Sequence, residues 1–264
     1  MERIFERLEK VRMVSPLVHH ITNYVTVSNC ASITKYFGGS PVMADAKEEV
    51  ADMVNLASSL VLNIGTLNNM QIESMKIAGI AANKKGIPVI LDVCGAGATK
   101  YRTQMCKELL ETFKVSVIKG NFSEIATIAG LNVQTKGVDS GKVAADKCEL
   151  AKTLAANIKA VVVITGAEDV ISDGTNTYSV KNGVPVMGAI VGTGCMASSV
   201  IGTFCAVEKD YALAAASALV CYEIAAENAE KTSDGSGTFI GSLFDKILML
   251  SEISVNKMKR ISKI

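Results

Sequence analysis

The segment Gly192-Thr193-Gly194-Cys195 combines a reactive thiol with a backbone that can approach a ligand closely, because glycine tolerates positive φ. A small, apolar run follows at residues 196–204, and its spacing predicts a buried helix that begins near Cys195. Free N–H groups and the helix dipole at such a start favour an anion. Two interpretations are open: a site where charge develops on a transferring group, or a glycine turn into a core helix with an inert thiol.

Further polar residues follow four short apolar runs, which are typical of parallel strands covered on both faces. The carboxyl ends of such strands share one edge of the sheet, where α/β proteins bind ligands. The runs are residues 59–64, 87–91, 115–118 and 160–164. The polar residues that follow the last three of them include Asp92, Lys119, Asn121, Glu124 and Thr165.

These residue types match the needs of phosphoryl transfer. Asp92 and Glu124 offer hard oxygen ligands for Mg²⁺, and Lys119 offers a cation for phosphate. Each also has a structural explanation: Asp92 and Asn121 as helix caps, Glu124 as a first-turn partner of the helix dipole, and Lys119 as a solvated rim charge. Their convergence on one sheet edge favours function.

The elements that must position these residues are strands alternating with helices, which predicts one α/β domain over residues 1–264. Residues 169–172 and 177–180 flank an Asp-Gly turn and predict an antiparallel hairpin. A final helix is expected after residue 235, capped by Ser236 or Thr238. Other helices are expected near the N-terminus and at residues 28–37, 68–85, 99–112, 139–158 and 211–230.

Composition limits the partners. A net charge of +1 gives no general field for nucleic acid or an acidic membrane, so a small molecule is expected. Seven cysteines without metal-ligand spacing indicate a reduced, cytoplasmic protein. Residues 182–207 carry no charge and are long enough to span a bilayer, but Pro185 and four glycines interrupt them, which favours burial in a large core. The glycines at residues 95–97 fit neither a dinucleotide fingerprint nor a P-loop.

Five motifs in this order resemble the hydroxyethylthiazole kinases of thiamine salvage, within the ribokinase-like small-molecule kinases. The resemblance runs from about residue 12 to residue 250. It implies a ribokinase-like three-layer α/β/α fold with a mostly parallel sheet, transfer of the ATP γ-phosphate to the hydroxyl of 4-methyl-5-(2-hydroxyethyl)thiazole, and a homotrimer with sites at subunit interfaces. The motifs are His20-Ile21-Thr22-Asn23-Tyr24-Val25-Thr26, Pro41-x-Met43, Leu62-Asn63-Ile64-Gly65-Thr66, Lys119-Gly120-Asn121-x-Ser123-Glu124-Ile125 and Gly192-Thr193-Gly194-Cys195.

The resemblance also implies roles for individual residues. Met43 and Gly192 would bind the thiazole, and Asn23, at a strand end, is either a further substrate ligand or a turn former. Cys195 stands where ribokinase-like relatives commonly carry an aspartate, so it would accept the proton of the attacking hydroxyl or position groups. The remaining assignments are Lys119, Thr165 and Asn121 to ATP, and Asp92 and Glu124 to Mg²⁺.

Three departures from the family pattern stand out. Asp92-Val93-Cys94-Gly95 replaces Asp-Pro-Val-Gly, Lys119 replaces arginine, and residues 235–239 read Gly-Ser-Gly-Thr-Phe in place of Gly-Pro-Gly-Ser-Phe. Lysine lacks the bidentate fork that arginine gives a phosphate, so weaker nucleotide affinity is expected. The alternatives are a kinase for another heterocyclic alcohol, of the hydroxymethylpyrimidine or pyridoxal type, a thiol-nucleophile enzyme acting through Cys195, and a non-catalytic nucleotide-binding oligomer.

Overall fold

The computed structural model describes residues 3–131 and 140–264. Within these residues the strands form one sheet in the order β2-β1-β3-β4-β5-β6-β7-β8-β9. The strands from β2 to β6 are parallel, and β7, β8 and β9 are antiparallel. Their bounds are β1 (Leu17–Ile21), β2 (Ser40–Val42), β3 (Ser59–Asn63), β4 (Val89–Asp92), β5 (Val117–Asn121), β6 (Val161–Thr165), β7 (Asp169–Ser172), β8 (Thr177–Val180) and β9 (Ile261–Lys263).

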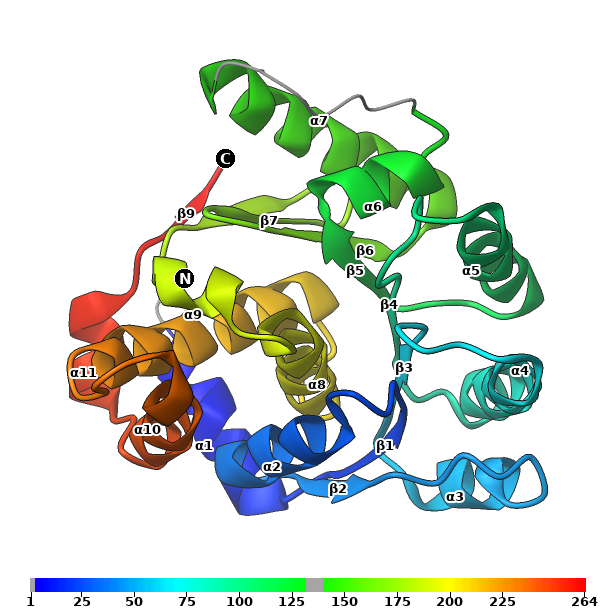
Figure 1. Ribbon diagram of the computed structural model, residues 1–264, viewed down its shortest axis with the longest axis horizontal. Helices are drawn as coiled ribbons and strands as arrows, with labels where there is room; N and C mark the ends of the chain where they lie inside the picture. The colour runs from blue at the N-terminus through cyan, green and yellow to red at the C-terminus, as the bar shows by residue number, and fades with distance from the viewer. Residues whose placement is uncertain (1–2, 132–139) are drawn as a thin grey trace.

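Helices cover both faces of this sheet, which gives the three layers that the sequence predicts (Figure 1). One face carries α3 (Val50–Leu56), α4 (Asn69–Lys85), α5 (Lys100–Thr112), α6 (Phe122–Ile128) and α7 (Ser140–Ile158). The other face carries α1 (Ile4–Val14), α2 (Val27–Phe37), α8 (Thr193–Cys205), α9 (Tyr211–Glu230), α10 (Ser236–Leu248) and α11 (Glu252–Met258).

The central strands are apolar throughout because side chains on both of their faces are buried. Val61 and Ile90 point into the core under α8 and α9, whereas Leu60, Leu62 and Leu91 point into the core under α4 and α5. This alternation with both faces apolar is the pattern of a covered parallel sheet. The prediction of parallel strands from the four apolar runs is confirmed.

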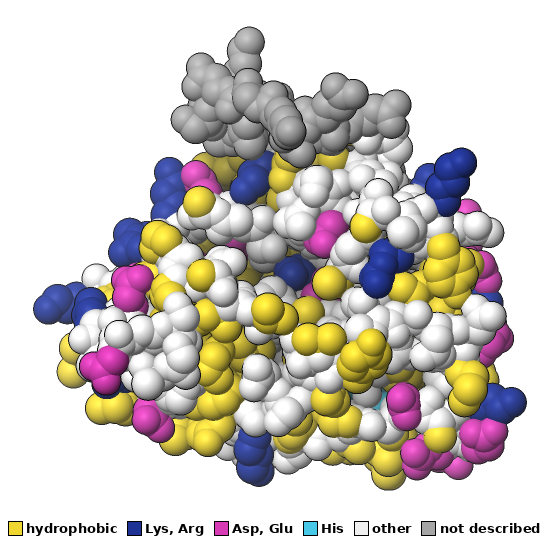
Figure 2. Space-filling view, viewed as in Figure 1, with side chains coloured by type: hydrophobic (Ala, Val, Ile, Leu, Met, Phe, Trp, Pro, Cys, Tyr) yellow, Lys and Arg dark blue, Asp and Glu magenta, His cyan; other side chains and the backbone are white. Residues whose placement is uncertain are grey.

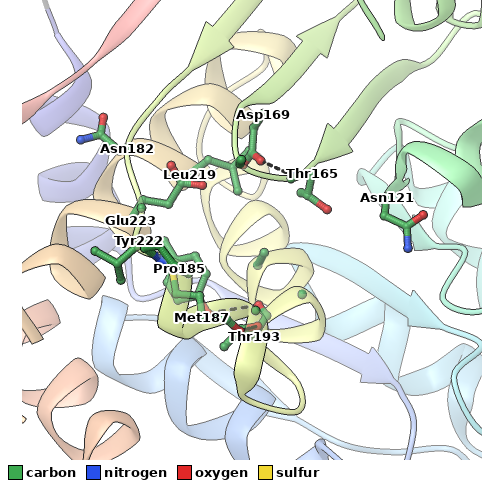
Figure 3. Close-up of a pocket in the computed structure, with 17 residues that line it drawn as sticks. Asn121, Thr165, Asp169, Asn182, Pro185, Met187, Thr193, Leu219, Tyr222 and Glu223 are labelled. Carbon is green, nitrogen blue, oxygen red and sulfur yellow. Dashed lines mark hydrogen bonds between the residues drawn. The ribbon is translucent and has the colours of Figure 1, made fainter. Parts of the chain in front are cut away.

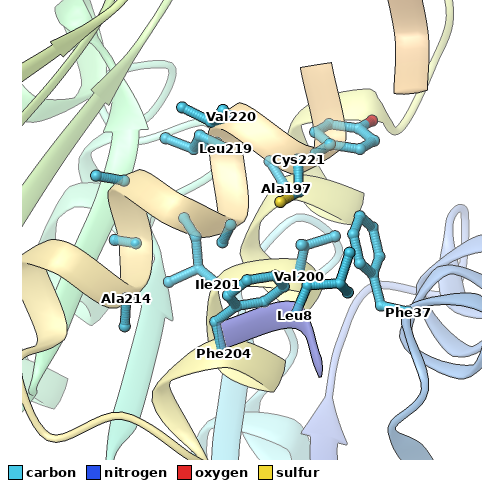
Figure 4. Close-up of a cluster of buried hydrophobic side chains, with 14 of the residues drawn as sticks. Leu8, Phe37, Ala197, Val200, Ile201, Phe204, Ala214, Leu219, Val220 and Cys221 are labelled. Carbon is cyan, nitrogen blue, oxygen red and sulfur yellow. The ribbon is translucent and has the colours of Figure 1, made fainter. Parts of the chain in front are cut away.

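The second half of the uncharged stretch at residues 182–207 is buried in α8, whose Val200, Ile201 and Phe204 pack in the core cluster beside α9 (Figure 4), whereas residues 183–195 are half-buried or exposed. Every residue from Met196 to Cys205 is buried. At Gly202 an added Cβ would lie only 2.3 Å from Val61 Cγ2, so a side chain there would push the helix off the sheet. No helix of the described residues is both long and apolar enough to cross a bilayer.

One local expectation differs from the structure. The N-cap of α10 is Gly235, so neither Ser236 nor Thr238 caps this helix as predicted. The hydroxyl of Thr238 instead accepts the Asp234 N–H, which satisfies the turn before the helix. Helix α8 begins at Thr193, which confirms the expected start near Cys195, and Gly192 adopts φ 97° at its N-cap. The hairpin of β7 and β8 has the predicted bounds.

Candidate active site

The polar strand ends predicted from the sequence meet at the carboxyl edge of the parallel strands. The register of the sheet pairs Asn63 with Asp92, and Asp92 with Lys119, on the adjacent strands β3, β4 and β5. The first turn of α8 lies over this edge, and Lys119 Nζ donates a hydrogen bond to Gly194 O over 3.0 Å. The structure therefore brings Asp92, Lys119 and the glycine loop together.

The backbone at the start of α8 lets a ligand approach closely. An added Cβ at Gly192 would lie 2.6 Å from Thr26 Cγ2, and the positive φ of Gly192 also disfavours a side chain. The N–H groups of the first helical turn, at Thr193, Gly194 and Cys195, precede the first i to i−4 bond, from Met196 N to Gly192 O. Such N–H groups at the positive end of the helix dipole form a site for a phosphate oxygen.

Lys119 is a buried cation with 4% of its surface exposed, so its interpretation as a solvated rim charge is wrong. Its Nζ lies 3.4 Å from Asp92 Oδ2, which also accepts a 2.7 Å hydrogen bond from the Ser198 hydroxyl. Burial disfavours the ammonium, but the surrounding acidic groups, Asp92 first, outweigh it and raise the pKa of Lys119 above its ordinary value. A fixed, fully charged ammonium therefore faces the start of α8.

Asn121 and Glu124 form a reciprocal capping box at the start of α6. Glu124 N donates to Asn121 Oδ1 over 3.0 Å, and Asn121 N donates to Glu124 Oε2 over 2.7 Å. The other carboxylate oxygen, Glu124 Oε1, accepts the Gly95 N–H over 2.7 Å. The structural explanation of Asn121 as a cap is confirmed, and Glu124 also fixes the glycine loop that follows β4.

The donor set at this edge fits a hydrated Mg²⁺. Within the described residues no three His, Cys, Asp or Glu side chains form a cluster that could enclose a metal ion. Mg²⁺ in kinases keeps several waters and binds through one or two carboxylates together with substrate phosphates. Asp92 Oδ1 is buried with no hydrogen-bond partner in the structure, and each Glu124 oxygen retains a lone pair beside its backbone hydrogen bond.

Cys195 differs from the other six cysteines in its electrostatics. Its pKa is lowered to about 6, chiefly by a hydrogen bond from the Cys94 thiol and also by the charge of Lys119, while burial and Asp92 act in the opposite direction. Asn23 Nδ2 lies 3.3 Å from Cys195 Sγ and donates to it. A large share of this thiol is therefore ionised near neutral pH. The pKa of each of the other cysteines is raised, first by burial except at Cys94, where the hydrogen bond to Cys195 leads.

Met43 lies apart from the group around Cys195. It follows β2, which is the edge strand beyond β1, and it is half-buried. Three strand spacings separate β2 from β4, which carries Asp92, so the two chain segments are roughly 14 Å apart. Gly192 and Asn23 lie between them, because Gly192 packs on Thr26 and Asn23 contacts Cys195.

A cavity of about 780 Å³ opens beside the start of α8 (Figure 3). Asn121 and Thr165 from the ends of β5 and β6 line one side, and Thr193 lines another. The remaining walls of the cavity are largely apolar and include Val184, Pro185, Met187, Ala197 and Leu219. This size and lining suit a small organic ligand such as a nucleotide.

One acidic pair in this cavity was not expected from the sequence. Glu223 of α9 and Asp169 at the start of β7 both line this cavity, and Asp169 Oδ1 accepts the Gly166 N–H over 2.8 Å. Burial raises the pKa of both carboxyl groups, and the charge of Asp169 raises that of Glu223 further, so the pair retains a proton. The available signal was an acid, Glu223, in the middle of the alanine-rich run of α9. Ser198, in the buried run after Cys195, was also missed.

The described architecture defines the class of protein. A ribokinase-like superfamily protein from Enterococcus faecalis aligns with a TM-score of 0.61 over 91% of this chain and 89% of its own, at 13% identity. At this level of identity the likeness concerns the fold alone. The protein thus has the ribokinase-like fold that the sequence predicts, with a mostly parallel sheet between two layers of helices.

The family follows from closer relatives. The model of the hydroxyethylthiazole kinase family matches residues 8–252, and the chain belongs to this family. Hydroxyethylthiazole kinase of Methanosarcina mazei is 51% identical over 257 residues, which cover 97% of this chain and 98% of the relative. The structure of a hydroxyethylthiazole kinase protein from Pyrococcus horikoshii OT3 aligns with a TM-score of 0.93 over 100% of both chains, at 39% identity. The resemblance seen in the sequence motifs is confirmed.

Proposed function

We propose that the protein transfers the γ-phosphate of ATP to the hydroxyl of 4-methyl-5-(2-hydroxyethyl)thiazole, a step of thiamine salvage. The observation that carries this proposal is the meeting of a buried lysine, an acidic strand end and the free N–H groups of α8 beside a nucleotide-sized cavity. Membership of the hydroxyethylthiazole kinase family supports the choice of substrate.

The nucleotide occupies the cavity with its phosphates toward the start of α8. Thr165 and Asn121 line the side of the cavity nearest β5 and β6. Lys119 Nζ is held beside the start of α8 by its hydrogen bond to Gly194 O, where it would contact the phosphate. Because the transferring phosphoryl group carries its charge on oxygens, fixed donors at Lys119 and the α8 N–H groups stabilise it without reorganising. The protein thus supplies position and charge more than covalent chemistry.

Mg²⁺ belongs beside Asp92 and Glu124. Asp92 Oδ1 lacks a partner, and Glu124 stands at the neighbouring strand end, so both carboxylates accept metal-bound waters or the ion itself. When bound, the ion neutralises charge on the phosphate oxygens. Asp92 also holds Lys119 through Oδ2, so Oδ1 of the same carboxylate is the oxygen that would hold the ion.

Cys195 is the group that accepts the proton of the substrate hydroxyl. Its sulfur lies in the first turn of α8, and its lowered pKa of about 6 gives a thiolate at neutral pH. A base whose pKa is near the working pH is suited to proton transfer. The thiazole lies on the side of Gly192, Asn23 and Met43, so its hydroxyl reaches Cys195 from the edge formed by β1 and β2.

The assembly proposed is a homotrimer whose sites lie between subunits. Tyr24, Val25 and Val191 are 77%, 58% and 73% exposed although they flank the site, since Thr26 packs on Gly192. Exposed apolar side chains gathered at one place mark a surface that a partner covers. Hydrophobic side chains gather around a hollow on the face shown in Figure 2. The distance between Met43 and Asp92 is also suited to a site completed by a second subunit.

The whole chain is proposed to act as one domain in a reducing cytoplasm. One continuous sheet joins residues 17 to 263 of the described chain, and the seven cysteines are free thiols, which fits a reducing compartment.

A panel of alcohols tests the proposed substrate. Labelled ATP is offered with the thiazole alcohol, hydroxymethylpyrimidine and pyridoxal, and transfer of label to each alcohol is measured. We expect the thiazole alcohol to have the highest kcat/KM. Preference for either of the others would move the protein to another heterocyclic alcohol, and no transfer to any alcohol would contradict a kinase. A substrate-derived mass on Cys195 would indicate a thiol-nucleophile enzyme instead.

A further inference from the structure

A chain of side-chain amides leads from the end of β3 to the sulfur of Cys195. The backbone N–H of Gly65 donates to Asn63 Oδ1 over 2.8 Å. The same oxygen accepts Asn23 Nδ2 over 3.0 Å, and Asn23 Nδ2 also donates to Cys195 Sγ over 3.3 Å. Both asparagines are buried, with 1% and 3% of their surfaces exposed. The amides therefore connect a rigid strand end to the thiol.

Backbone donors fix the orientation of both amides. A backbone N–H can only donate, so the atom that Gly65 N contacts must be the oxygen of Asn63. Thr26 N donates over 3.0 Å to Asn23 Oδ1, and the Thr26 hydroxyl donates to the same oxygen over 3.0 Å. The nitrogen of Asn23 must therefore face Asn63 and Cys195, and the sulfur must act as a hydrogen-bond acceptor.

The space around this chain permits no easy rearrangement. An added Cβ at Gly65 would lie 3.0 Å from both Asn23 Cβ and Asn63 Oδ1, so a side chain there would crowd the two amides. Asn63 Nδ2 is buried without a partner, which is costly for an amide donor. An unpaired buried amide lowers the stability of the fold, so the presence of asparagine at position 63 indicates a role other than stability.

We propose that Asn63 and Asn23 form an amide relay that holds Cys195 as a hydrogen-bond acceptor, with Asn23 touching the reacting thiol and Asn63 acting as a positioning residue. The catalytic consequence of the relay rests on the proposed kinase function. The effect of the relay on the protonation of the Cys195 sulfur is independent of that function. A donor that favours the thiolate keeps the sulfur ready to accept a proton from a substrate hydroxyl.

Other groups also act on Cys195 and must stay unchanged in a test. Cys94, after β4, and Thr26, before α2, hydrogen-bond to it, and Lys119 of β5 attracts the thiolate, whereas Asp92 of β4 repels it. The charge of Cys195 in turn raises the pKa of Cys30 of α2 and of Tyr222 of α9. The test therefore uses substitutions that leave these groups in place.

The test is Asn23→Asp, which keeps the shape of the side chain and replaces the donor that faces the sulfur by an acceptor. The rate of Cys195 alkylation by iodoacetamide is followed against pH in substrate-free protein, with the site located by intact mass and peptide mapping. We expect the midpoint of this pH profile to move up from about 6, and the rate at pH 7 falls about tenfold when the midpoint rises from 6 to 8. Asn55→Asp, on the exposed face of α3, is the matched control and should leave the midpoint unchanged.

Asn63→Leu tests the positioning role separately, because it removes the oxygen that holds Asn23 while adding no charge. We expect the midpoint to rise by less than in Asn23→Asp, with circular dichroism and the melting temperature confirming the fold. An unchanged midpoint in folded Asn23→Asp protein would overturn the relay. A raised midpoint in a protein whose wild type transfers no phosphate would support the relay and refute the proposed kinase function.

Discussion

Lys119 Nζ lies 3.4 Å from Asp92 Oδ2, and both side chains are almost completely buried. The two residues occupy paired positions on adjacent parallel strands, so the sheet register fixes their separation. Removing one member of such a pair leaves the other charge buried without compensation, which typically costs about 3 to 5 kcal/mol. The pair thus links the electrostatics of the site to the stability of the fold.

We predict that Asp92→Asn lowers turnover by roughly a hundredfold, in the range seen when one electrostatic contact to a transition state is lost. The amide keeps the size of the side chain but loses the charge that binds Mg²⁺ and holds Lys119. Turnover is measured against Mg²⁺ concentration, with Asp52→Asn on the exposed side of α3 as the control. Glu124→Ala should act in the same direction, and wild-type rates in either variant at saturating Mg²⁺ would refute the metal assignment.

Cys195→Asp should keep or improve activity, whereas Cys195→Ala should be slowed and not abolished. A carboxylate accepts the proton of the hydroxyl as a thiolate does. Because the active form is deprotonated, kcat/KM of the wild type should rise with pH through about 6. In Cys195→Asp this limb should move toward lower pH. Steady-state pH profiles check this, with Cys148→Ala as the control for losing a thiol.

The opposite outcome would identify a nucleophilic cysteine. A folded but inactive Cys195→Asp protein, or a substrate-derived adduct on the wild-type thiol in intact mass spectra, would contradict a role in proton transfer.

Glu223→Gln should raise stability, and the gain should grow with pH. The pKa values of Glu223 and Asp169 are raised in the folded protein, so above the unfolded carboxyl range the folded state binds more protons than the unfolded chain. Stability is therefore lost as pH rises toward the folded pKa values. Melting temperatures at pH 5 and pH 8 measure the difference, with the exposed Glu230→Gln of the same helix as the control. An equal or smaller gain at pH 8 would count against a shared proton.

Val25→Lys together with Val191→Lys should dissociate the trimer and remove activity, because a charge would replace apolar surface at the subunit contact. Ile80→Lys, on the exposed side of α4, places a lysine on the opposite face of the sheet and should change neither property; each valine substitution is also measured alone, so that the charge added equals that of this control. Sedimentation velocity reports the mass of each variant. An active wild-type monomer at micromolar concentration would contradict shared sites.

The sequence predicts best what local chemistry determines. The apolar runs of β3, β4 and β6 and the Asp-Gly hairpin need no distant partner to be recognised, and the motif around Cys195 indicates both a helix start and a ligand site. The capping box of Asn121 and Glu124 also follows from a spacing of three residues.

Features that depend on distant packing were not predictable in this way. Strand β9 has three residues, and its place beside β8 depends on contacts across more than eighty positions of chain. The burial of Lys119 depends on α8 lying over the strand ends. The raised pKa of Glu223 depends partly on Asp169, which lies on β7, far from Glu223 in the sequence. Such contacts between distant residues cannot be predicted from residue type and spacing.

A single-turnover experiment with γ-labelled ATP, Mg²⁺ and the thiazole alcohol tests the central claim most directly. Enzyme in excess over ATP is quenched at successive times, and the label is separated into ATP, free phosphate, protein and the thiazole phosphate. Direct transfer predicts that label passes from ATP to the thiazole phosphate, with none on the protein and little as free phosphate. Label that accumulates on the protein, or that appears only as free phosphate, would contradict direct transfer to the thiazole hydroxyl.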